Sequence, residues 1–139
     1  MGSWAKQIDE SKAIMEQLAS IYIIARVCLA AIFVYSGVDK FLNWQGVIAE
    51  CKAFKLPFPR FVAAATIALH IIGGLCLIFG IAVFPVALAL ATFTFLATLL
   101  AHNFWTHNGE TFGRELTTAL EHLGIVGGLI LLGFVSKGF

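Results

Sequence analysis

The feature that most restricts the fold of this chain is a long stretch without any charged side chain. Between residues 61 and 101 the sequence contains no Asp, Glu, Lys or Arg. A helix of that length would measure about 60 Å, at about 1.5 Å per residue. Because the hydrocarbon core of a bilayer is about 30 Å thick, the stretch predicts two spanning helices. The segment GIAVFP at residues 80–85 is expected to divide them, since proline is tolerated in the first turn of a helix.

Two further apolar runs lie on either side of this stretch, at residues 21–38 and 117–135. The whole chain is 60% hydrophobic and only 12% charged, whereas a soluble domain carries about 25% charged residues. The sequence therefore predicts an all-α integral membrane protein built as a four-helix up-down bundle, with both termini on one side. The predicted spans are 21–38, 61–80, 84–102 and 117–135.

Two segments outside the spans have a pattern of their own. Residues 1–20 carry charges of both signs and helix-forming side chains, which predicts an amphipathic segment on the membrane surface ahead of a membrane domain at 21–139. Between the first two spans, apolar side chains recur at helical spacing: Trp44, Val47, Ile48, Cys51 and Phe54. This face predicts a short interfacial helix, which should end at the segment LPFP because a residue before proline leaves the helical conformation.

Ionisable side chains inside the spans are the best guide to function, because they are costly in hydrocarbon. On the up-down path, Lys40, His102, Glu121 and His122 should meet at the mouth opposite the termini, with His70 beneath them. These five are the candidate ligand-binding residues. Structural polar roles are assigned to three others: Arg26, Asp39 and Arg114. Trp44 and Trp105 should border the same mouth as interfacial anchors.

Several chemistries would suit this group of residues. A quinone headgroup fits an apolar pocket with a few convergent polar groups, with histidine donating to a carbonyl and a carboxylate relaying its proton. A pair of histidines, His70 with His122 or His102 with His122, could instead ligate haem b, which is the less favoured cofactor. A metal site of two histidines and a carboxylate, from His102, His122 and Glu121 with His107 as a further ligand, is another alternative. The spacing of His102 and His107 is not diagnostic of such a site, so no metal is assigned. In the remaining interpretation, the polar groups pair with one another and fix the register of the helices.

Composition and motifs exclude some functions. The net charge of +1 gives no case for nucleic-acid binding. The three cysteines form no CxxC pair, which argues against a membrane thiol oxidoreductase with its own dithiol. With no nucleotide or flavin motif either, the chain is not predicted to be a complete oxidoreductase, and another subunit would have to supply electrons. Transport is disfavoured, because nothing resembles the paired broken helices of transporters.

Four pieces of sequence, in this order, resemble the DoxX family of small four-helix membrane proteins. The first is ARVCLAAIFVYSGVDKFLNW, in which Arg26 and the pattern S-G-x-x-K at residues 36–40 match the family. The others are AFKLPFP, GGLCLIFG, and LAHNFWTH followed by HLGIVGGLILLG. The chain differs from many relatives at His70, where they carry a glutamate nearby, and at Glu121–His122, where they carry Lys-Asn.

This resemblance implies a bacterial inner (cytoplasmic) membrane location and a link to redox chemistry, since the family takes its name from a thiosulfate:quinone oxidoreductase of the membrane. It implies either a quinone-linked accessory subunit of a membrane complex or a non-catalytic structural subunit or assembly factor. The second role would use Gly- and Ala-rich helix faces to hold a membrane partner. In both cases the expected partners are the lipid bilayer and other membrane subunits or further copies of the chain.

Overall fold

The computed structural model describes residues 2–138, which form helices and turns with no strand. The elements are α1 (Ser3–Leu42), α2 (Trp44–Ala53), α3 (Pro59–Phe79), α4 (Val83–Ala101), the short 3-10 helix η1 (Phe104–Thr106) and α5 (Gly109–Val135). Four of the helices, α1, α3, α4 and α5, are long and apolar enough to cross a membrane. The prediction of an all-α, four-helix membrane fold with a short helix between the first two spans is confirmed.

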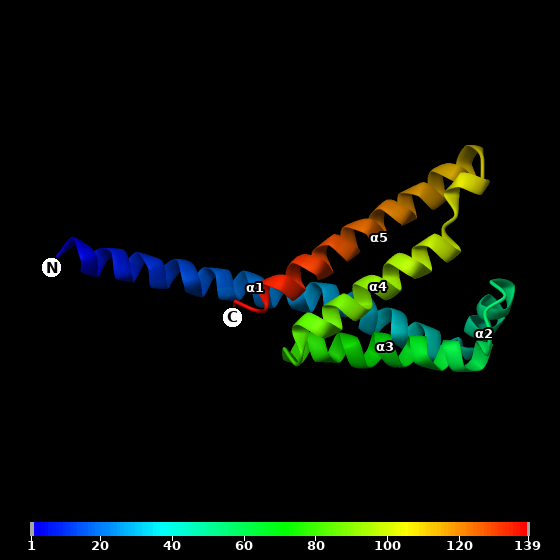
Figure 1. Cartoon of the computed structure of the whole chain (residues 1–139), viewed down its shortest axis with the longest axis horizontal. Helices are drawn as coiled ribbons and strands as arrows, with labels where there is room; N and C mark the ends of the chain where they lie inside the picture. Colours follow the sequence, from blue (N-terminus) through cyan, green and yellow to red (C-terminus); the bar gives the residue numbers. More distant parts are fainter. Residues whose placement is uncertain (1, 139) are drawn as a thin grey trace.

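The four long helices are arranged as two antiparallel pairs (Figure 1). α1 packs most extensively on α3, and α4 packs most extensively on α5. The pairs meet near the α3–α4 turn and diverge toward α2 and η1, so the bundle is closed at one end and open at the other. The C-terminus and the N-terminal half of α1 both lie on the side of the closed end.

Two of the long helices begin well before their apolar runs. α1 starts at Ser3 and passes through residue 20 without a break, and its N-terminal half extends beyond the other helices (Figure 1). α5 starts at Gly109, ahead of the predicted span at 117–135. An apolar run indicates only the part of a helix that lipid can surround. The helix itself continues as long as the neighbouring residues are good helix formers, so it can begin before the apolar run.

Glycines allow α1 and α3 to approach each other closely. A Cβ atom on Gly37 would lie 3.0 Å from Cβ of His70, and one on Gly74 would lie 3.2 Å from the carbonyl oxygen of Ala30. Because lipid provides no hydrophobic drive for helix association, such close backbone packing is a main source of stability. The glycine of the S-G-x-x-K pattern is therefore a contact residue for α3.

The apolar core lies at the closed end, where all four long helices contribute to it. The neighbouring Gly73 faces the other way from Gly74, since a Cβ atom there would meet Leu90 of α4 at 3.3 Å. Around this point the buried side chains form one cluster: Ala30, Phe33, Leu77, Val83, Ala87, Leu90, Ala91, Val126, Leu129 and Leu132. The face of α3 formed by His70, Gly73, Gly74 and Leu77 is buried.

The α3–α4 turn is built on a glycine that ends α3. Gly80 has φ 74°, in the left-handed region that glycine adopts without strain. The backbone N–H of Ile81 donates to the carbonyl of Cys76 at 2.8 Å, and that of Gly80 donates to the carbonyl of Leu77 at 3.3 Å. This pair of hydrogen bonds is the Schellman motif, and it reverses the chain within three residues at the closed end.

The short helix α2 is amphipathic and covers the start of α3. Its apolar face buries Val47, Ile48 and Cys51 against Ala63. Burial raises the pKa of the Cys51 thiol above its ordinary value of 9.0, and the nearby charge of Glu50 raises it further. Since the thiolate is the reactive form, Cys51 serves as a packing residue at neutral pH.

A substitution at Gly74 tests whether the close approach of α1 and α3 holds the fold together. Gly74→Ala would place a methyl group 2.6 Å from Cγ2 of Val34, so the helices must separate. We expect a loss of about 1–3 kcal/mol, the usual cost of overpacking, measured by unfolding in mixed micelles. Gly127→Ala is the matched control, because nothing lies within 4 Å of that position. Equal stability of the two variants would contradict this role for Gly74.

Candidate functional site

His102 and His122 contact each other at the open end of the α4–α5 pair. His102 follows the last residue of α4, and His122 lies on α5. Their ring centroids are 5.1 Å apart in an edge-to-face arrangement. The two histidines that the sequence assigned to the mouth are therefore neighbours, and each is held by a different polar partner.

His102 is held by a carboxylate. Its Nδ1 lies 2.8 Å from Oε2 of Glu115 on α5. Because an ionised carboxylate only accepts hydrogen bonds, the ring nitrogen donates and carries a proton at Nδ1. Both side chains are partly exposed, at 26% and 22%, so protons can exchange between this pair and the surroundings.

His122 is held by a threonine. Oγ1 of Thr98 donates its single proton to the carbonyl of Thr94 at 2.6 Å, and it also lies 2.8 Å from Nδ1 of His122. With its own proton committed, the hydroxyl oxygen accepts from the Nδ1–H of the ring. In the neutral ring, Nε2 then carries a lone pair and has no hydrogen-bond partner among residues 2–138, so it can accept a hydrogen bond.

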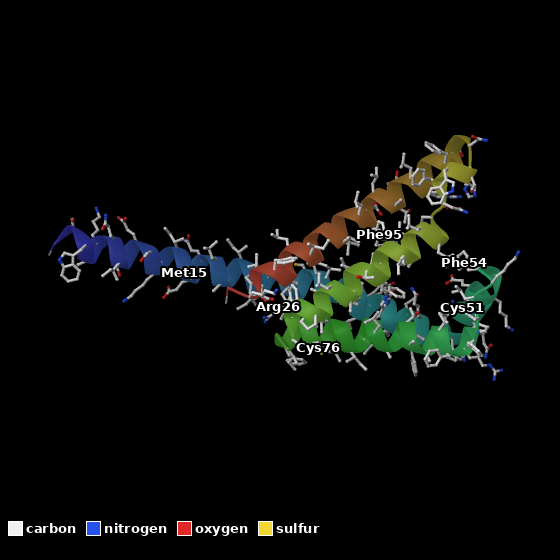
Figure 2. The ribbon with its side chains drawn as sticks, viewed as in Figure 1. Met15, Arg26, Cys51, Phe54, Cys76 and Phe95 are labelled. Atoms are coloured by element: carbon white, nitrogen blue, oxygen red, sulfur yellow. The ribbon has the colours of Figure 1, made fainter. Side chains whose placement is uncertain are left out.

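A cavity of about 200 Å³ adjoins the histidine pair, between α4, α5 and η1. Apart from His102, His122 and Thr98, its wall is made of apolar and aromatic side chains. They are Phe95, Leu99, Phe104, Trp105, Leu116, Ala119, Leu120, Leu123 and Val126. Several of these side chains, including Phe95 and Leu120, are also exposed on the outer surface. Figure 2 shows Phe95 on α4 beside α5. The cavity can therefore be reached from the lipid.

His70 lies away from this cavity and is packed by aromatic rings. It is 5% exposed, and its ring meets Phe33 of α1 at 5.4 Å and Phe93 of α4 at 4.9 Å, both edge to face. Within residues 2–138 neither of its ring nitrogens has a hydrogen-bond partner. From its position on α3, His70 thus contacts both α1 and α4.

Lys40 is half-buried in the last turn of α1. Its Nζ donates to Oγ of Ser36 one turn earlier, at 3.0 Å, which accounts for two positions of the S-G-x-x-K pattern. Lys40 does not line the cavity beside His102 and His122.

Four other predicted residues remain at the periphery. Glu121 is exposed and does not line the cavity, although its charge acts on His122. Asp39 and Arg114 are exposed, and neither forms an ion pair within residues 2–138. Nδ1 of His107 lies 3.2 Å from the carbonyl oxygen of Asn103 and stays within its own loop.

The arrangement of the histidines bears on the metal and haem alternatives. Among the described residues, no three His, Cys, Asp or Glu side chains are grouped so as to hold a metal ion. His102 and His122 contact each other directly, so no haem plane fits between their rings. The pair does suit a small planar ligand that offers a hydrogen-bonding oxygen to Nε2 of His122.

Sequence reasoning missed Glu115 and Thr98. Glu115 stands before the predicted span at 117–135, yet its helical spacing to His122 places both on one face of α5. Thr98 is an ordinary polar residue of a spanning helix, where hydroxyl groups bond to their own backbone. The helical register of residues 115 and 122 was the available signal for Glu115, whereas only the packing of α4 on α5 identifies Thr98.

Comparison with known proteins gives a consistent family assignment. A family model described as DoxX matches residues 21–103. The inner membrane protein YphA of Escherichia coli (strain K12) is 20% identical over 118 residues, which cover 85% of this chain and 84% of the relative. The inner membrane protein YqjF of the same organism is 28% identical over 116 residues, 84% of each chain. No solved structure matches.

The tautomer of His122 tests this description of the site. We expect neutral His122 to carry its proton at Nδ1, and Thr98→Val to shift it toward Nε2, because the acceptor at 2.8 Å is lost. The ¹⁵N chemical shifts of labelled histidine in lipid report the two tautomers directly, with His122→Ala assigning the signal. Thr118→Val is the control, since that hydroxyl bonds only to the carbonyl of Arg114. An unchanged tautomer in Thr98→Val would exclude the hydrogen bond.

Proposed function

The chain belongs to the DoxX family and is an integral membrane protein of the bacterial inner membrane, and from this premise we propose that it binds a quinone headgroup. The binding site is the cavity between α4, α5 and η1. In this proposal the protein is an accessory subunit of a membrane redox complex, and a partner subunit supplies the electrons.

The proposal rests on one observation: an apolar cavity adjoins two histidines that are each held by a hydrogen bond. The cavity of about 200 Å³ has room for one substituted ring. Its apolar and aromatic wall suits such a ring, and a few fixed polar groups are the usual way a ligand pocket sets orientation. The exposed apolar side chains at the rim would let an isoprenoid tail remain in the lipid.

The hydrogen bonds of the two histidines suit the protonation of a quinone. Reduction of a quinone to a quinol takes up two electrons and two protons. When doubly protonated, His122 would donate through Nε2 to a quinone carbonyl. When neutral, it would accept from the quinol hydroxyl. His102 and Glu115 would carry protons from the surface toward His122, since an adjacent carboxylate stabilises the protonated imidazole.

Tryptophan fluorescence gives a direct test of quinone binding. Trp4→Phe and Trp44→Phe leave Trp105, which lines the cavity, as the only tryptophan. We expect a short-chain quinone to quench its emission saturably. His122→Ala should weaken binding about tenfold, since a hydrogen bond contributes about 0.5–1.5 kcal/mol and 1.4 kcal/mol is tenfold. His107→Ala is the control outside the cavity. Quenching that never saturates, or that is equal in both variants, would rule out this site.

A second candidate function is the binding of a membrane partner without catalysis. It is favoured by a glycine face on α5: Gly124 and Gly127 have nothing within 4 Å of a Cβ position. Small residues of this kind allow another helix to approach closely. Gentle detergent extraction should then yield a partner at fixed stoichiometry, and Gly124→Leu should release it. Extraction of a homogeneous, partner-free chain would count against this role.

A further inference from the structure

The second cavity of the molecule lies at the closed end, far from the histidines. Its volume is about 340 Å³. It is bordered by the middle of α1, the α3–α4 turn and the C-terminal end of α5, and Figure 2 labels Arg26 at this place. Two basic side chains, Arg26 and Lys137, line it together with Tyr22 and Ser136. The proposed quinone site uses none of these residues.

Arg26 is positioned by α3 but has donors to spare. Its Nη2 donates to the carbonyl of Ile78 over a long 3.4 Å, and its Nε is buried without a hydrogen-bond partner in residues 2–138. The lack of a side chain at Gly80 makes room for the guanidinium, because a Cβ atom there would lie 2.7 Å from Nη1. The carbonyl of Ile78 and the ring of Tyr22, whose centre lies 5.4 Å from Cζ of Arg26, thus hold the guanidinium in place and use only part of its hydrogen-bonding capacity.

Lys137 brings a second positive charge to the same cavity. Its Nζ lies 3.6 Å from the centre of the Phe84 ring and 5.4 Å from that of Phe134. A cation over an aromatic face is attracted to it and is held in place. The ammonium group is therefore fixed at the wall of the cavity although the residue is exposed.

No acidic side chain of residues 2–138 lines this cavity or forms an ion pair with either cation. The nearest carboxylates along α1, those of Glu16 and Asp39, are roughly 15 and 20 Å away at 1.5 Å per residue. Two positive charges with an unpartnered buried N–H are costly beside hydrocarbon, and a bound anion would offset that cost.

The position of the cavity indicates the kind of anion. It adjoins the turn between two spanning helices, which is where lipid headgroups lie. Exposed apolar side chains stand next to its lining residues along the chain or pack on them, among them Ile23, Phe79 and Phe134, and these would contact acyl chains. The planar fork of arginine matches the oxygens of a phosphate. We propose that Arg26 and Lys137 bind the phosphate of an anionic lipid headgroup at the closed end of the bundle.

Native mass spectrometry of the full chain from detergent tests the proposal, with phosphatidylglycerol as the probe and phosphatidylcholine as the neutral comparison. We expect one phosphatidylglycerol per chain to be retained preferentially. Arg26→Gln and Lys137→Gln should each weaken its retention at least fivefold. Lys137→Gln affects an exposed side chain, so it remains informative if Arg26→Gln fails to fold. Lys6→Gln with Lys12→Gln is the control, because it removes two cations of α1 outside the cavity.

Competition separates a lipid from a soluble anion. Inorganic phosphate at 10 mM should not displace the retained lipid, since it lacks the acyl contacts. Displacement would show a site for soluble phosphate and would overturn the lipid assignment. Equal retention of the two lipids, or equal losses in the cavity variants and in the α1 control, would show only general attraction to membrane charge and would also overturn it.

Discussion

The close packing of α1 on α3 is the interaction on which the rest of this structure depends. In a bilayer the hydrophobic effect does not drive helices together, so their association rests on surface fit and on hydrogen bonds. Gly37 and Gly74 provide that fit by removing the side chains that would keep the two backbones apart. The same contact places His70 against α1, so the packing of the helices also positions this polar group.

The polar groups of the bundle also gather at its two opposite ends. At the closed end, where all four helices share a core, the charges are positive and lie at the rim of a cavity beside the α3–α4 turn. At the open end the histidines, Glu115 and Thr98 form short hydrogen bonds between α4 and α5. The bundle therefore carries a basic cavity at one end and a hydrogen-bonded histidine–carboxylate pair at the other.

How far the sequence predicted the site depends on the residue. Ala30, Phe33 and Gly37, the buried residues of α1, recur at helical spacing, and such a face can be read from the sequence because periodicity within one helix requires no knowledge of its neighbours. The meeting of His102 with His122 also followed from an up-down path. A carboxylate does bond to one histidine of this pair, but it is Glu115 on His102 and not the candidate Glu121. That residue is one position from His122, and a step of 100° turned it to the exposed side, whereas Glu115 lies two turns earlier on the face of His122.

The sequence by itself determined that the chain is helical and lies in a membrane, because hydrocarbon leaves backbone groups no other partner than their own helix and four runs are long enough to span it. It also determined where small residues permit close packing. Only the tertiary structure decided that the bundle opens at one end, which partners hold His102 and His122, and that Arg26 and Lys137 face one cavity. These features depend on the angles between helices, which arise from side chains fitting across an interface and leave no period in the sequence.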